Sequence, residues 1–268
     1  MPYAQRDVPS GEKLYYVDTA ENAASTAQTV FFCHGAGGNS TSWWQQIPEF
    51  AVGYRCLAHD HRGFGRSACA PGQFSVAEFG ADALAVMDAA GVERAHFVCQ
   101  SMGGWTGVQM ALGHPERIAS LVLADTIGGL ALPSGLESVR TMGERAAAAG
   151  AVSPALAADF PRTHPAGAFL YLQLSAFNTA FESLDLFRRL FAPDVRVPLA
   201  RAAELTLPVL VVAGTRDLIW PPSVLRELAG HLPDARVVEV DAGHSAYFEN
   251  PLTFNRALAG FLDEVAPR

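Results

Sequence analysis

The chain has 268 residues, of which 50% are apolar and 17% are charged, and its formal net charge is −8. These values are typical of a folded globular protein, and the length is enough for one large α/β domain with a substantial core. The acidic balance argues against a nucleic-acid partner. No run of 18 apolar residues is present, so we expect no membrane span.

The start of the chain and its cysteines bear on the cellular compartment. The first twenty residues lack the charged and then apolar layout of a secretory signal peptide. The four cysteines follow no metal-ligand spacing, and three of them lie on or near apolar runs, as buried thiols do: Cys33, Cys56, Cys69 and Cys99. We therefore expect a reduced cytoplasmic protein with no structural disulfide, no metal and no cofactor.

Short apolar runs between turn residues predict strands along most of the chain. These strands cover 14–17, 29–33, 54–58, 95–98, 118–124, 207–213 and 236–240. Helical segments are predicted between them at 43–50, 75–90, 105–112 and 221–231, and from Pro251 onward. Two helix starts carry signals: Ser75 with Glu78 predicts a capping box, and Asn250 precedes a proline at the first helical position.

The pattern changes between residues 126 and 203. Strand signals disappear there, and helical segments rich in Phe, Ala and Leu are interrupted by prolines. We interpret 126–203 as a helical cap inserted into a core formed by 1–125 and 204–268. Strands that alternate with helices in this core predict a mostly parallel sheet with helices on both faces.

Polar residues follow several of the predicted strands at the point where each strand ends. They are His34, Asp60, Ser101, Asp125, Asp217 and His244. In parallel sheets, ligands bind beyond the carboxyl ends of the strands. Because polar residues placed independently would rarely all fall at strand ends, we expect this edge of the sheet to hold the functional site.

The central motif is Val98-Cys99-Gln100-Ser101-Met102-Gly103-Gly104. It follows a buried strand and precedes a helix, so Ser101 lies in a sharp turn that exposes its hydroxyl beside the first N–H groups of the helix. The residues two before and two after this serine must be small. Gly103 fits, whereas Cys99 departs from the usual G-x-S-x-G pattern.

Six motifs together resemble the α/β-hydrolase family over nearly the whole chain. They are HGAGGNS at 34–40, DHRGFGRS at 60–67, CQSMGG at 99–104, HPERIASLVLAD at 114–125, GTRD at 214–217 and AGHSAYFENP at 242–251. The order serine, acid, histidine is also that of the family. The resemblance implies an eight-stranded, mostly parallel sheet with an inserted helical cap. It says little about substrate.

The resemblance also implies roles for individual residues. Ser101 is the expected nucleophile, His244 its base, and Asp217 the acid that orients His244. The backbone N–H groups of Ala36 and Met102 are the expected oxyanion hole. Asp125 is an alternative acid, because some lactone-hydrolysing relatives allow an acid after the sixth strand. Around the site, we expect His34 to hold loops together and Asp60 to pair with Arg62.

A substrate pocket is expected between the serine turn and the cap. Its predicted walls are aromatic: Trp43, Trp105, Trp220 and Tyr247, with cap residues Phe169, Tyr171, Phe177, Phe181, Phe187 and Phe191. Such walls favour an apolar or aromatic acyl or alcohol group. The cap also carries three basic residues near its return to the sheet: Arg188, Arg189 and Arg196. We expect all three to be solvated, and the alternative is that one of them receives a substrate carboxylate.

These features predict a serine hydrolase that cleaves a small carboxylic ester or lactone through an acyl-enzyme. Two alternatives stay open: a carbon–carbon bond hydrolase of ring-cleavage products with the same triad, and a hydrolase-like ligand receptor. Haloalkane dehalogenases and epoxide hydrolases are disfavoured, because those families carry an aspartate at the position where this chain has Ser101. Cofactor-free oxygenase and perhydrolase activities are minor alternatives. The expected partner is a small-molecule substrate, and the oligomeric state is open.

Overall fold

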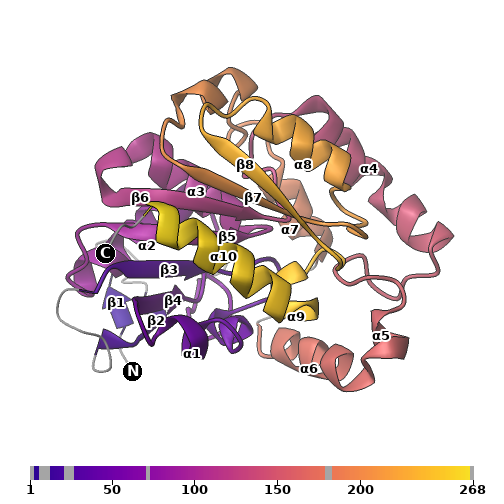
Figure 1. Cartoon of the computed structure of the whole chain (residues 1–268), viewed down its shortest axis with the longest axis horizontal. Coiled ribbons are helices and arrows are strands. Elements are labelled where there is room, and N and C mark those ends of the chain that lie inside the picture. Colours follow the sequence, from indigo (N-terminus) through magenta and orange to yellow (C-terminus); the bar gives the residue numbers. More distant parts are fainter. Residues whose placement is uncertain (1–2, 6–12, 21–26, 71–72, 179–182, 266–268) are drawn as a thin grey trace.

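The computed structural model describes residues 3–5, 13–20, 27–70, 73–178 and 183–265. Its centre is an eight-stranded sheet in the order β1-β2-β4-β3-β5-β6-β7-β8 (Figure 1). The strands are β1 (Tyr3–Gln5), β2 (Lys13–Asp18), β3 (Thr29–Cys33), β4 (Arg55–His59), β5 (Ala95–Gln100), β6 (Ile118–Ala124), β7 (Val209–Gly214) and β8 (Ala235–Val240). The β1–β2 and β2–β4 pairs are antiparallel, and all other neighbours are parallel. The predicted fold class is therefore confirmed.

Residues along each central strand alternate between two apolar layers. In β3, Phe31 packs in one layer, and Val30 and Phe32 pack in the other. In β7, Val211 and Val212 divide between the same two layers. Because both faces of these strands are covered, their sequences are continuous apolar runs, and this is why the sequence reveals them clearly.

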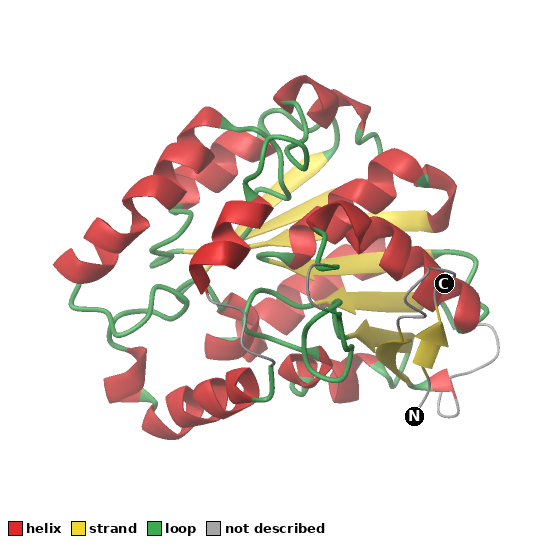
Figure 2. Ribbon diagram, turned by 180° about the vertical axis from the view of Figure 1, so that it is seen from behind, coloured by secondary structure: helices red, strands yellow, loops and turns green. Residues whose placement is uncertain are grey.

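Helices cover both faces of the sheet. One face packs against α1 (Ile47–Phe50), α9 (Ala246–Glu249) and α10 (Pro251–Val265). The other packs against α2 (Phe79–Ala89), α3 (Gly103–Gly113) and α8 (Pro222–Ala229). Helix α10 crosses in front of the sheet in Figure 1, and Figure 2 shows the molecule from behind. No helix among the described residues is long and apolar enough to cross a bilayer.

The chain between β6 and β7 is helical. It forms α4 (Pro133–Ala148), α5 (Phe160–Thr163), α6 (Pro165–Ala176) and α7 (Ser183–Leu190), followed by a 3₁₀ turn at Leu199–Glu204. Figure 1 shows α5 and α6 together at one side of the molecule, beyond the ends of the strands. The division into a core and a cap at residues 126 and 203 stays a prediction.

Several local predictions differ from the structure. The helix predicted at 43–50 is a 3₁₀ turn, Ser40–Trp43, followed by α1, because Asn39 caps the turn and Pro48 begins a new helix. Ser75 makes no side-chain cap bond, and a 3₁₀ turn at Val76–Glu78 precedes α2. Strand β1 was not predicted. The final helix begins as expected, with the Thr253 N–H donating to Asn250 Oδ1 at 3.3 Å.

Candidate active site

Ser101 lies between the end of β5 and the start of α3, with a φ of 48°. A non-glycine residue at positive φ is strained, and the surrounding contacts must hold it in place. The Ser101 N–H donates to Ala124 O at 3.0 Å. A side chain at Gly103 would place its Cβ 2.3 Å from Cys33 O. Helix α3 therefore approaches β3 closely enough to require glycine at this position.

Cys99, the departure from the usual motif, is accommodated by Gly107 on α3. A Cβ at Gly107 would lie 2.7 Å from Cys99 Sγ. The thiol occupies the space that a side chain on α3 would otherwise fill. The sulfur is buried in the apolar layer beneath the helix, where it packs as a small apolar group.

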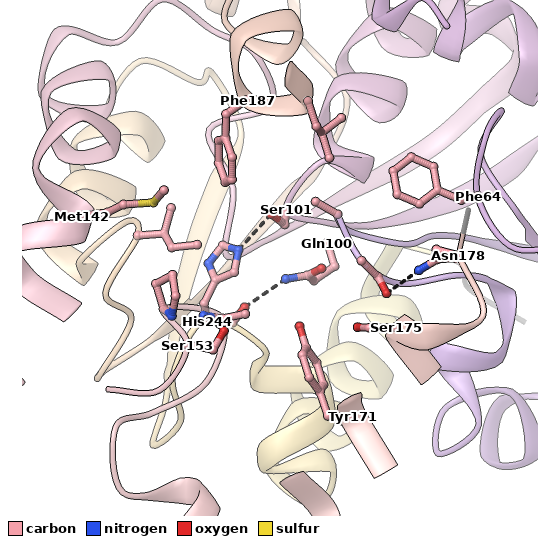
Figure 3. A pocket seen from close by; sticks show the side chains of 16 residues that line it. Phe64, Gln100, Ser101, Met142, Ser153, Tyr171, Ser175, Asn178, Phe187 and His244 are labelled. Atoms are coloured by element: carbon pink, nitrogen blue, oxygen red, sulfur yellow. Dashed lines mark hydrogen bonds between the residues drawn. The ribbon is translucent and has the colours of Figure 1, made fainter. Parts of the chain in front are cut away.

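Three side chains form a hydrogen-bonded series at the carboxyl edge of the sheet. Ser101 Oγ lies 2.8 Å from His244 Nε2, and His244 Nδ1 lies 2.9 Å from Asp217 Oδ2 (Figure 3 shows the first contact). Asp217 Oδ1 accepts from the N–H groups of Ile219 and Trp220, at 2.6 and 3.1 Å. The carboxylate is thus fixed by backbone donors and faces the imidazole.

Asp125, the alternative acid, has different partners. Its φ is 49°, and its carboxyl group accepts from the N–H groups of Gly214 and Ala246, at 2.7 and 3.2 Å. Burial and then the charge of Asp217 raise the pKa of Asp125 well above its ordinary value. The residue therefore joins the end of β7 to the segment that follows His244. Of the two acids, the geometry brings only Asp217 to the imidazole.

The two expected oxyanion donors lie next to Ser101. Neither the Ala36 N–H nor the Met102 N–H donates to a described residue. A Cβ at Gly35, beside Ala36, would lie 3.0 Å from Ser101 Cβ, so this loop runs against the serine. Both N–H groups are therefore free to bind an oxygen atom that develops charge beside Ser101.

His34 fixes the position of the loop that contains Ala36. Its Nε2 accepts from the His61 N–H at 2.9 Å, so the proton is on Nδ1, which donates to Gly35 O at 2.8 Å. Burial lowers the pKa of His34 and favours the neutral ring. The side chain thus joins two loops, as the sequence suggested.

The expected pairing of Asp60 with Arg62 is wrong. Asp60 accepts from the backbone N–H groups of Ser40 and Arg66, at 2.6 and 2.7 Å. Arg62 pairs instead with Asp82 on α2, through Nε at 2.6 Å and Nη2 at 2.6 Å. Both partners of this pair are buried, and their two-point geometry satisfies charges that would otherwise be costly in the interior.

A cavity of about 560 Å³ opens over Ser101 and His244. Its lining residues are Ala36, Gly37, Phe64, Gln100, Ser101, Met142, Ser153, Pro154, Ala155, Tyr171, Ser175, Asn178, Leu186, Phe187, Ile219 and His244. Within the described lining there is no Lys, Arg, Asp or Glu. No group of three or more His, Cys, Asp or Glu side chains suited to a metal occurs in the described chain. The site is therefore an uncharged chamber around a serine and a histidine.

Four of the aromatic residues predicted to line the pocket lie in the core instead. Trp43 packs between Phe32 and Tyr247, with ring centroids 5.0 and 4.6 Å away. Trp105 donates to Leu190 O, and Trp220 lies behind His244 and donates to Gly135 O. Burial of such large rings removes much apolar surface from water, and this favours their place in the core. The correction thus covers Trp43, Trp105, Trp220 and Tyr247.

The cap aromatics divide between the cavity and the surface. Tyr171 and Phe187 line the cavity, whereas Phe177 does not line it and is 71% exposed. Phe169 is also exposed, and Phe191 packs on Trp105. Phe181 lies outside the described residues. The three cap arginines Arg188, Arg189 and Arg196 do not line the cavity, and Arg189 donates to Phe74 O at 3.0 Å.

Sequence reasoning missed four polar residues of the cavity: Gln100, Ser153, Ser175 and Asn178. Gln100 directly precedes the serine, and its Nε2 donates to His244 O at 2.9 Å. Ser175 and Asn178 follow Tyr171 at helical spacing. Their periodicity at 171, 175 and 178 was the available signal, because such positions share one helix face.

Comparisons with known proteins identify relatives of this chain. The sequence pattern of the alpha/beta hydrolase fold matches residues 28–251. The chain is 33% identical to a protein of Caulobacter sp. (strain K31) that carries the name carbamate hydrolase RutD, over 94% of this chain and 96% of that one. It is 29% identical to a Mycobacterium tuberculosis protein that carries the name non-heme bromoperoxidase BpoC, over 93% of this chain and 99% of that one. The crystal structure of the enol-lactonase from Burkholderia xenovorans LB400 matches with a TM-score of 0.77 at 27% identity, and covers 97% of this chain and 99% of that chain.

Proposed function

The chain belongs to the α/β-hydrolase fold family, and we propose that it is a serine hydrolase that cleaves a small carboxylic ester or lactone through an acyl-enzyme. The observation that carries the proposal is the hydrogen-bonded series of Ser101, His244 and Asp217. Ser101 and His244 of this series line a mostly apolar cavity. A serine hydroxyl is a weak nucleophile unless a base within hydrogen-bond reach takes its proton.

Acylation begins when Ser101 Oγ attacks the carbonyl carbon of the substrate. The serine proton passes to His244 Nε2, 2.8 Å away, while Asp217 stabilises the resulting imidazolium through Nδ1. The carbonyl oxygen becomes an oxyanion that accepts from the Ala36 and Met102 N–H groups. His244 then returns the proton to the leaving oxygen as its bond to the acyl carbon breaks.

Deacylation repeats these steps with water as the nucleophile. His244 takes a proton from water, the hydroxide attacks the acyl carbon, and the bond to Ser101 Oγ breaks as the serine regains a proton. The product is a carboxylic acid. Ser101 and His244 are then back in their starting protonation states, and one water molecule has been consumed.

The substrate class is inferred from the cavity, because the names of the relatives differ. Those names state a carbamate hydrolase, a bromoperoxidase and an enol-lactonase. Apolar side chains form much of the described wall, including Met142, Leu186 and Phe187. Such a wall favours a small substrate with an apolar or aromatic acyl or alcohol group.

The alternative in the same fold is a carbon–carbon bond hydrolase of ring-cleavage products. Its dienol carboxylate substrate requires a partner for the negative charge, and an unpaired carboxylate in an apolar chamber is costly. The described lining offers no Lys or Arg for this purpose. This observation favours the ester or lactone. A hydrolase-like receptor would differ by lacking turnover.

A burst assay with mass spectrometry tests the proposal. The panel contains chromogenic esters from acetyl to aryl acyl groups, a five-membered lactone and a carbamate ester. We expect an initial burst of the leaving group and an added acyl mass on the peptide that contains Ser101. The Ser101→Ala variant should lose the adduct and nearly all turnover while its melting temperature stays close to that of the wild type.

Each other result has a definite meaning. Near-normal ester hydrolysis by Ser101→Ala would show that the nucleophile is wrong. If the folded wild type gave no burst and no adduct with any member of the panel, the esterase mechanism would be refuted, and the carbon–carbon hydrolase or the receptor would take its place.

A further inference from the structure

The cavity over Ser101 has an apolar side and a polar side. The apolar side is formed by Phe64, Met142, Leu186, Phe187 and Ile219. The polar side includes Tyr171 and Ser175. In Figure 3 these two side chains lie together below Ser101, opposite Phe187. A substrate bound to Ser101 would therefore meet two chemically different surfaces.

Tyr171 and Ser175 both belong to α6. They are four residues apart, so they lie one turn from each other on the face of the helix that meets the core. The opposite face carries exposed residues such as Leu172 and Gln173. Tyr171 and Ser175 thus present their hydroxyl groups from one helix face, whereas the other polar lining residues come from other segments: Gln100, Ser153 and Asn178.

The hydrogen bonds of this face leave two hydroxyl groups available. Ser175 Oγ has no hydrogen-bond partner among the described residues. Tyr171 Oη lies 3.1 Å from Ser245 Oγ, and a phenol oxygen can make at least one further hydrogen bond. The side-chain amide of Asn178, by contrast, already has partners, because Nδ2 donates to Gly37 O and Oδ1 accepts from the Gly65 N–H.

Ser175 is also close to the expected oxyanion loop. A Cβ at Gly37 would lie 3.3 Å from Ser175 Oγ, so the hydroxyl lies directly against the loop that contains Ala36. A group of the substrate that reaches Ser175 would therefore lie near the reacting carbonyl. A polar contact at such a position affects which ester is cleaved.

We propose that Tyr171 and Ser175 form a subsite for an uncharged hydrogen-bonding group of the substrate, such as a hydroxyl or an amide. This inference rests on the proposed ester hydrolysis at Ser101. The substrate is then an ester or lactone with an apolar part against Phe187 and Met142 and a neutral polar part against α6.

The same surfaces disfavour a charged group. No described lining residue is Lys or Arg, so a substrate carboxylate would lose its water without gaining a cationic partner. Burial raises the pKa of Tyr171, so the phenol stays protonated and its oxygen carries no charge at neutral pH.

Esters of ethanol that share a six-carbon acyl chain test the subsite. They are ethyl hexanoate, ethyl 3-hydroxyhexanoate, ethyl 6-hydroxyhexanoate and monoethyl adipate. We expect the wild type to have a higher kcat/KM for at least one hydroxylated ester than for ethyl hexanoate, and the lowest value for monoethyl adipate. In Ser175→Ala, the ratio of the hydroxylated to the plain ester should fall by about threefold to tenfold, the effect of one neutral hydrogen bond.

Two further variants make the result specific. Tyr171→Phe should lower the same ratio, because only the hydroxyl is removed. Gln173→Ala, on the exposed face of α6, should leave the ratio at its wild-type value. The subsite would be refuted if Ser175→Ala left the ratio unchanged, if both hydroxylated esters were poorer than ethyl hexanoate, or if monoethyl adipate were the best substrate. A lack of turnover with every ester would refute the proposed function instead.

Discussion

Asp217 and Asp125 follow neighbouring strands at the same edge of the sheet, and both side chains are buried. Their partners separate them. Asp217 offers one oxygen to two backbone N–H groups and the other to His244, whereas both oxygens of Asp125 accept from backbone N–H groups. A carboxylate that is occupied in this way stabilises loops but cannot orient the imidazole.

Asparagine substitutions separate the two acids by experiment. In Asp217→Asn, the amide NH₂ would face His244 Nδ1, because the backbone donors retain the remaining oxygen. His244 would then carry its proton on Nε2 and could not accept one from Ser101. We expect kcat to fall by about 10³- to 10⁴-fold. Asp125→Asn should lower the melting temperature and reduce kcat by less than about tenfold.

Both kinetic and thermal measurements are needed for each variant. A larger loss of kcat in Asp125→Asn than in Asp217→Asn would contradict the assignment of the acid. Rescue supplies the control: Asp217→Glu keeps a carboxylate and should recover part of the activity that Asp217→Asn loses.

Ser101, Asp217 and His244 could be found from the sequence because each lies shortly after a predicted strand, within a motif that resembles the family. The walls of the cavity could not. A tryptophan such as Trp43 has the same sequence signal whether it packs in the core or against a ligand. Short polar residues such as Ser175 have no distinctive signal unless the helix face that carries them is already known.

At the scale of elements, helix α6 is connected to the core through polar contacts at its C-terminal end. Asn178 Nδ2 donates to Gly37 O at 2.6 Å, and Asn178 Oδ1 accepts from the Gly65 N–H at 2.9 Å. Asn39 Nδ2 donates to Leu174 O at 3.0 Å. The helix thus bonds to the loop that contains the Ala36 N–H, one residue before Gly37.

Asn178 is therefore expected to act as a positioning residue for the oxyanion loop. Asn178→Ala removes both hydrogen bonds and frees the Gly37 carbonyl. We expect kcat to fall by about tenfold, the effect of one or two neutral hydrogen bonds, with a smaller change in KM. Binding of a boronic acid that forms a tetrahedral adduct should weaken by a similar factor.

The control is Leu172→Ala, which alters an exposed side chain on the same helix and should change neither quantity. If Asn178→Ala lowered the melting temperature and left kcat and boronic acid binding unchanged, the residue would only stabilise the fold. The boronic acid measurement distinguishes these cases because it reports on the oxyanion site itself.

The elements themselves differ in how far the sequence determines them. The buried parallel strands were predicted because apolar residues continue through them on both faces. Strand β1 has only three residues, Tyr3–Gln5, and pairs along a single edge, so no periodicity can reveal it. The 3₁₀ turns at Ser40–Trp43 and Val76–Glu78 depend on loop hydrogen bonds that sequence patterns do not express.

At the scale of the whole molecule, four buried histidines couple stability to pH. Burial lowers the pKa of each one: His34, His59, His61 and His96. In the folded protein each one binds a proton only at a lower pH than in the unfolded chain, where a histidine is protonated below a pH of about 6.5. The unfolded state then binds more protons than the folded state. The contribution of these histidines to the free energy of unfolding therefore falls as the pH drops below about 6.5.

His59 gives the clearest test, because burial lowers its pKa to about 3 and neither ring nitrogen has a hydrogen-bond partner among the described residues. Its ring stacks on Phe31, with the ring centroids 5.1 Å apart.

His59→Leu keeps a similar volume and removes the titrating group. Between pH 6 and 4 the free energy of unfolding should therefore fall less steeply in the variant than in the wild type. The two slopes should differ by about 1.4 kcal/mol per pH unit. Urea unfolding at several pH values measures the slope, which does not depend on any constant effect of the substitution on packing. His231→Leu at an exposed site is the control, and equal slopes in the wild type and His59→Leu would show that His59 does not contribute to the acid sensitivity of the fold.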